Sequence, residues 1–230
     1  VSEAGSVWIN DARARGDRFA YGLYSVLGLG CARHLMRDSP EAAALEIQEA
    51  MEPWTTGAFG GQHLGEASAV SLVHMYRGGT ASEEYWRDLW PRVRSKFLAR
   101  AEFARELFAF CRADACLRSA LEDKARSPRL LAQARELVGS LRKATGIPRA
   151  LGLMLMAQIE TLEGNREAAI ERAKQVPEAT GQVGVAIEAY AALLLTYLEH
   201  PRAFVASYEG QVERLRLMGW NKPEKATQLY

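Results

Sequence analysis

Histidine, cysteine and glutamate side chains occur at spacings that could support metal binding or acid–base chemistry. Cys31 and His34 are three residues apart, which places them on one face of a helix as half of a metal site. No second pair at a zinc-like spacing follows, so the pattern favours a buried cysteine beside a helical histidine. An enzyme site would have to use His63, Glu66 and His74, but the two histidines stand about three helical turns apart. We therefore expect no metal, no cofactor and no catalysis by this segment.

Three further patterns have a simpler structural interpretation than the binding motifs they suggest. Gly28-Leu29-Gly30 is similar to part of a glycine-rich phosphate loop, but no strand precedes it and the Lys-Ser/Thr ending is absent. Glycines within a helical pattern more often permit close approach of two helices. Cys111 and Cys116 point in different directions on a helix, and no base is placed to activate either. Trp86 and Trp90 lie four apart on one helical face, which is typical of packing between helices.

Charge is nearly balanced overall but unevenly placed along the chain. A net charge of +1 is too small to attract the chain to nucleic acid or to an anionic membrane, so we expect neither as a partner. Residues 38–76 contain acidic side chains and no Lys or Arg, whereas residues 118–149 are rich in basic ones. One basic run is more simply interpreted as a solvated face, and the other interpretation is binding of an acidic or phosphorylated protein segment. This basic run consists of Arg92, Arg94, Lys96 and Arg100.

The elements that must position these residues are helices. Ala, Leu, Glu and Arg dominate the sequence and no segment alternates like a strand, so an all-α fold is predicted. Proline, glycine and asparagine mark five corners, at 38–40, 77–79, 126–128, 163–165 and 199–201. Helices are expected at 2–15, 18–36, 40–51, 63–77, 81–96, 99–125, 128–144, 148–162, 166–176, 182–198 and 202–218. Pro177 is expected to block continuation of the helix before it.

The corners recur at intervals of about 35 to 50 residues, which is the range of tetratricopeptide and related helical repeats. This spacing predicts a right-handed superhelical solenoid of antiparallel helix pairs, with residues 1–230 as a single domain and a weaker boundary near 52–62. The first helix of each pair would line a concave surface. These first helices are expected at about 18–36, 63–77, 99–125, 148–163 and 182–198.

Composition indicates an ordinary globular protein. The chain has 230 residues, of which 48% are hydrophobic and 25% charged, enough for a substantial core. Its apolar stretches are too short or too interrupted to cross a bilayer, and we expect no secretory signal because the first residues lack a basic region followed by an apolar one. Three cysteines without a framework spacing are expected to be reduced thiols of a cytoplasmic protein. The missing initiator Met and an unpaired first helix indicate a fragment of a larger protein.

Several short motifs resemble the long helical region of large bacterial serine/threonine protein kinases of the myxobacterial type. They are Ala12–Asp17, Gln62-His63, Tyr76–Gly79, Arg112–Leu117 and, above all, Met218–Lys225 closing on Leu229-Tyr230. In that family a kinase domain is followed by tetratricopeptide-like repeats that sense or dock partners. This chain contains none of the kinase catalytic motifs, so the resemblance implies a C-terminal regulatory or recruiting arm.

The expected function is therefore that of a non-catalytic protein–protein interaction or sensor module. Its partner would be a protein or peptide, and contact with the parent kinase or self-association are both compatible with the pattern. Two alternatives stay open at this point. One is a structural scaffold that holds a parent enzyme in an oligomer, and the other is the enzyme site described above.

Overall fold

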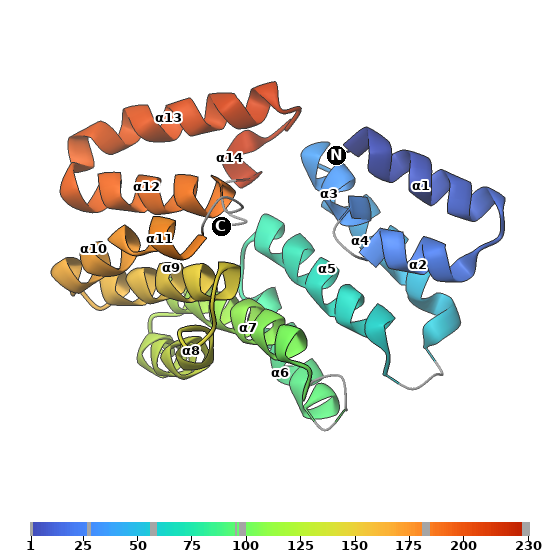
Figure 1. Cartoon of the computed structure of the whole chain (residues 1–230), viewed down its shortest axis with the longest axis horizontal. Helices are drawn as coiled ribbons and strands as arrows, with labels where there is room; N and C mark the ends of the chain where they lie inside the picture. The colour runs from blue at the N-terminus through green and yellow to red at the C-terminus, as the bar shows by residue number, and fades with distance from the viewer. Residues whose placement is uncertain are drawn as a thin grey trace. The chain divides into compact units, whose positions relative to one another are not determined.

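The fold is all-α in the part of the chain that the computed structural model describes, as the sequence predicts (Figure 1). The described residues are 2–26, 29–55, 59–94, 96, 100–180 and 185–226. Over these ranges there is no strand. Helix propensity and the 3.6-residue apolar period therefore agree with the observed secondary structure.

Most helices begin and end within a few residues of their expected positions. The N-terminal helices are α1 (Ser2–Ala14), α2 (Arg18–Val26), α3 (Leu29–Met36), α4 (Pro40–Met51), the 3₁₀ helix η1 (Glu52–Trp54) and α5 (Gly61–Arg77). The middle helices are α6 (Ala81–Val93), α7 (Glu102–Glu122), α8 (Ser127–Leu141) and α9 (Ile147–Leu162). The C-terminal helices are α10 (Arg166–Lys174), α11 (Val176–Thr180), α12 (Val185–Glu199), α13 (Pro201–Leu217) and α14 (Pro223–Ala226).

All five expected corners fall between helices. At the corner between α9 and α10, Gly164 has φ of 82°, a left-handed conformation that glycine adopts without steric cost. Proline is the first residue of α4 and of α13. It is tolerated there because the N–H groups of the first helical turn have no acceptor within the helix, so the N–H that proline lacks breaks no helical hydrogen bond. Turn chemistry at these residues therefore accounts for the helix boundaries that the sequence predicts.

The prediction of one helix at 18–36 is wrong, because the structure has two helices there, α2 and α3. A Cβ atom on Gly30 would lie 2.7 Å from both the Cα and the carbonyl oxygen of Ser25, so the start of α3 packs directly on the end of α2. The close approach expected of these glycines is confirmed at Gly30, while Gly28 lies outside the described residues. Apolar periodicity misses such a break because both halves keep the same period.

A second difference concerns Pro177. Helix α10 ends at Lys174, and Pro177 lies in the first turn of the short helix α11 rather than after the last helical residue of its region. Proline is tolerated in a first turn, so the same residue that stops one helix can open another. Helix α14 likewise has a proline, Pro223, in its first turn, and the sequence does not predict this helix.

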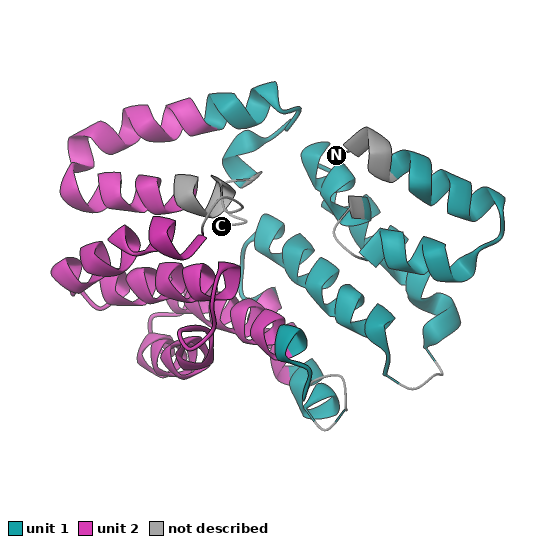
Figure 2. Cartoon of the chain, viewed as in Figure 1, with its two compact units in different colours: residues 1–81, 88–104, 212–229 teal, residues 82–87, 105–211, 230 magenta. Residues whose placement is uncertain are grey.

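The chain forms two compact units, coloured in Figure 2. Unit 1 comprises residues 1–81, 88–104 and 212–229, and unit 2 comprises residues 82–87, 105–211 and 230. Each unit is thus assembled from segments that are separated in sequence. The single domain over 1–230 with a weaker boundary near 52–62 stays a prediction.

Each unit buries its own apolar residues. In unit 1, α2, α3, α4 and α5 share one cluster, against which Trp220 also packs. The buried members are Val26, Cys31, Leu35, Ala43, Ile47, Met51, Ala69, Val73 and Tyr76. In unit 2, one cluster joins α7, α8 and α9, and another joins α9, α11 and α12. Alanines occupy many of these positions, which permits close approach of the helices.

Among the described residues, no helix combines the length and the apolar character needed to cross a bilayer.

We predict that Gly30→Ala destabilises unit 1 by about 1–3 kcal/mol, because the new methyl group would overlap the backbone of Ser25. Gly61→Ala is the matched control in the same unit, since a Cβ atom at Gly61 meets no atom within 4 Å. Urea unfolding followed by circular dichroism measures both variants. Equal stability of the two would contradict the close approach of α2 and α3.

Candidate functional site

The basic run lies at the end of α6 and in the connection to α7. Arg92 is in the last turn of α6, Arg94 follows the helix, and Lys96 and Arg100 lie beyond it. All four side chains are exposed, and all four residues belong to unit 1. Positive charge is favourable at this place, because the end of a helix presents unpaired carbonyl groups.

The four cations of the basic run have no ion-pair partner among the described side chains. Other basic side chains do: Arg118 Nε lies 2.6 Å from Asp114 Oδ2, and Arg135 Nη1 lies 3.0 Å from Glu160 Oε1. The one electrostatic neighbour seen is Glu66. Burial raises the pKa of that carboxyl group, and His63 and then Arg92 partly oppose the shift. The basic run therefore supplies four exposed cations that are close together in the sequence.

The residues of the enzyme alternative have other roles or lie apart. His63 Nδ1 accepts a hydrogen bond from the Gly60 N–H at 3.0 Å, and its Nε2 lies 3.2 Å from the carbonyl oxygen of Trp54. This imidazole therefore caps the start of α5. His74 lies eleven residues further along α5, roughly 16 Å away at the rise of an α-helix. Burial lowers its pKa, with a smaller contribution from Arg77.

Cys31 and His34 both face the interior of unit 1 but have different partners. The Cys31 thiol lies 3.9 Å from the carbonyl oxygen of Ala69, and burial raises its pKa to about 12. A thiol of this pKa is protonated at neutral pH and is a poor metal ligand. Over the described residues, no three His, Cys, Asp or Glu side chains are placed to hold a metal ion. Cys31 is thus a core residue, as the sequence favours.

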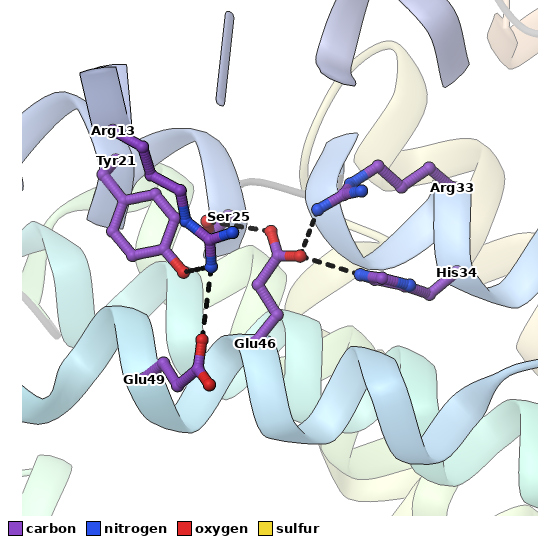
Figure 3. Close-up of polar contacts among 7 residues, drawn as sticks. All are labelled: Arg13, Tyr21, Ser25, Arg33, His34, Glu46 and Glu49. Carbon is purple, nitrogen blue, oxygen red and sulfur yellow. Dashed lines mark hydrogen bonds and ion pairs between the residues drawn. The ribbon is translucent and has the colours of Figure 1, made fainter. Parts of the chain in front are cut away.

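His34 instead belongs to a buried polar cluster around Glu46, drawn in Figure 3. The cluster consists of Ser25 from α2, Arg33 and His34 from α3, and Glu46 from α4. Ser25 Oγ donates to Glu46 Oε1 at 3.1 Å, while His34 Nε2 lies 2.7 Å from Oε2. The Arg33 guanidinium donates to the same Oε2. Only 8% of the Glu46 side chain is exposed, so three donors replace the water that the carboxylate loses.

A second polar group extends the contacts of α4 to α1. Arg13 Nη2 donates to the Tyr21 hydroxyl at 2.6 Å and to Glu49 Oε2 at 3.2 Å (Figure 3). The guanidinium carbon of Arg13 also lies 4.6 Å from the centroid of the Tyr21 ring. About half of the Arg13 and Glu49 side chains is exposed, so this pair contributes far less than the buried one.

The composition of the Glu46 cluster resembles that of a serine hydrolase, but its geometry does not. In such enzymes the histidine lies between the acid and the serine and removes the serine proton. Here Ser25 and His34 both bind the one carboxylate, and Ser25 is fully buried. The cluster can hold α2 and α3 on α4, and it cannot activate Ser25 as a nucleophile.

The sequence held one signal for this cluster. Glu46 lies on the same face of α4 as Ala43, Ile47 and Ala50, all of which are buried. A carboxylate on an apolar face requires a donor from another element. That element could not be named, because Ser25 and Arg33 are distant in sequence and α2 and α3 were expected to be one helix.

The remaining candidates are packing residues. Cys111 and Cys116 are buried in α7, and burial raises the pKa of Cys116 to about 12. Trp86 is buried and meets Phe108 edge to face at 5.4 Å, which confirms packing between α6 and α7. Trp90 is half-buried.

Comparison of the chain with family models, with curated proteins and with solved structures gives no match to any of the three.

We predict that Glu46→Gln lowers the free energy of unfolding by about 3 kcal/mol, because it leaves the Arg33 guanidinium largely buried without a counter-charge. Glu49→Gln is the matched control on the same helix, and it should cost less than about 1 kcal/mol. Chemical denaturation of both variants measures the difference. If the two losses are equal, the Glu46 cluster does not anchor these helices.

Proposed function

We propose that this chain is a non-catalytic helical-repeat module that binds an acidic protein segment through the basic run. The observation that carries the proposal is the combination of four exposed cations within nine residues and no ion-pair partner among the described side chains. Guanidinium groups form paired hydrogen bonds with carboxylates and phosphates, so both aspartate- or glutamate-rich and phosphorylated segments fit.

The same proposal includes a right-handed superhelical solenoid of antiparallel helix pairs. Its support is the packing of helices on close neighbours in the chain: α8 on α9, α9 on α10, and α10 on α12. Contacts between consecutive elements are the defining property of repeat proteins, which usually present a surface to a partner. A cytoplasmic location is also proposed, and its support is the odd number and the spacing of the three buried cysteines.

We further propose that the module is the C-terminal arm of a bacterial serine/threonine protein kinase. The support is the sequence resemblance described above, which spans much of the chain and is most specific at Met218–Lys225. In this arrangement the basic run would recruit an acidic substrate or regulator to the kinase.

Electrostatic recruitment has a characteristic dependence on salt. Exposed charges act over the Debye length, about 8 Å at physiological ionic strength, and mainly increase the rate of association. Binding through the basic run should therefore weaken as salt is raised.

We predict that reversing the basic run weakens binding of an acidic peptide at least about tenfold, equivalent to about 1.4 kcal/mol. The variant is Arg92→Glu, Arg94→Glu, Lys96→Glu and Arg100→Glu, and the probe is a fluorescein-labelled dodecapeptide of alternating glutamate and serine, with and without phosphoserine. Fluorescence anisotropy at low and physiological salt measures the dissociation constant.

The control for this experiment reverses four other exposed cations of the same types. It consists of Arg129→Glu, Arg142→Glu, Lys143→Glu and Arg149→Glu. Both variants change the net charge equally, so only the position of the charges differs. Binding that survives reversal of the basic run, or falls equally in the control, would rule out the basic run as the docking site.

A further inference from the structure

The C-terminal segment of the chain lies on unit 1, on residues that precede it by more than 140 positions. We call residues 219–226 the tail. Helix α14 of the tail contacts α3 and α5. Specific tail contacts reach Met36, Arg37, Asp38 and Tyr76, which lie at the ends of α3 and α5. We call these four residues the tail site.

Main-chain groups at the end of α3 are the first part of the tail site. The Asn221 N–H donates to the carbonyl oxygen of Met36 at 2.8 Å, and its Nδ2 donates to the carbonyl oxygen of Arg37 at 3.3 Å. Met36 is the last residue of α3, so no N–H of the helix donates to its carbonyl oxygen. One asparagine thus satisfies two carbonyl groups that the helix leaves unpaired.

An aromatic ring and a carboxylate complete the tail site. The Trp220 ring stacks on the Tyr76 ring, with centroids 6.3 Å apart. Lys225 Nζ lies 2.8 Å from Asp38 Oδ1, which also accepts a hydrogen bond from the Tyr76 hydroxyl at 3.1 Å. The hydrogen bond from Lys225 is the main reason why the pKa of Asp38 is lowered. Asn221 therefore has its own receptor groups, whereas Trp220 and Lys225 share Tyr76, because Lys225 Nζ also lies 5.5 Å from the centroid of that ring.

The tail lies at the surface of unit 1. Pro223 is its one buried residue among those whose side chains are described, and Trp220 and Lys225 are half-buried. The core of α2, α3, α4 and α5 beneath it is continuous without these residues. The chain enters the tail through Gly219, whose φ of 93° is a conformation that favours glycine.

We propose that the tail site is a peptide-binding surface for segments with a Trp-Asn pair and a lysine four residues after the asparagine, and that the tail fills it as an intramolecular ligand. A second copy of the segment, supplied by another molecule of this chain, is the partner that fits it. Because a tethered ligand acts at an effective concentration of about millimolar, the attached tail excludes an added peptide unless it is released. This inference is independent of the basic run.

The test uses the full chain with its own tail weakened by Trp220→Ala and Lys225→Ala. A fluorescein-labelled peptide of residues 216–226 with the native sequence is the probe. This opened variant should bind the peptide at least about tenfold more tightly than the wild-type chain does, because its site is no longer occupied. Adding Asp38→Asn and Tyr76→Leu to the opened variant should abolish the gain.

Two peptide variants test which contacts matter. Asn221→Ala in the peptide should weaken binding, since it removes the donor to Arg37. Met218→Ser should leave binding unchanged, since Met218 is 63% exposed. An opened variant that keeps the wild-type circular dichroism and cooperative unfolding but binds the peptide no better than wild type would overturn the proposal.

Hydrogen exchange on the wild-type chain tests release of the tail without any substitution, and so it applies even if the opened variant does not fold. The Asn221 amide should exchange through a local opening, at least about tenfold faster than the amide of Val73 in the core of α5. Equal protection of the two amides would make the tail part of the core folding unit, and the proposal would then be wrong.

Discussion

The ion pair between Glu46 and Arg33, with His34 and Ser25 on the same carboxylate, is the interaction on which unit 1 depends. A carboxylate that is only 8% exposed must be met by donors, and here all of them come from α2 and α3. The Glu46 carboxylate therefore joins α2 and α3 to α4, beside the apolar core that the three helices share. Helix α5 then packs on the same core, which places Tyr76 beside the end of α3.

The two surfaces of functional interest differ in how their charges are used. In the basic run, four cations project into solvent without partners among the described side chains. In the tail site, Asp38 already binds both Lys225 and Tyr76. A surface of the first kind attracts an opposite charge from a distance, whereas one of the second kind must exchange a ligand it already has. Unit 1 thus combines an open surface with an occupied one.

Local chemistry made much of the secondary structure predictable. The helix at 40–51 was expected with the bounds of α4, and all five corners separate helices, because proline and glycine act on their immediate neighbours. The helix at 18–36 failed for the opposite reason. The structure has two helices in this range, α2 and α3, and Gly30 near the start of α3 lies close to the backbone of Ser25, a contact that leaves no mark on apolar periodicity. Exposure of the basic run was equally readable, since charged residues rarely lie buried without a partner.

By itself the sequence determined the all-α class, the corners and the solvated basic run, because these follow from propensity, turn geometry and charge within a few residues. Only the tertiary structure decided which side chains meet. Ser25 and Glu46 are separated by 21 residues, and Lys225 and Asp38 by 187. Both contacts require helices to pack at particular places, and helix packing depends on the shapes of whole faces rather than on any local run of residues.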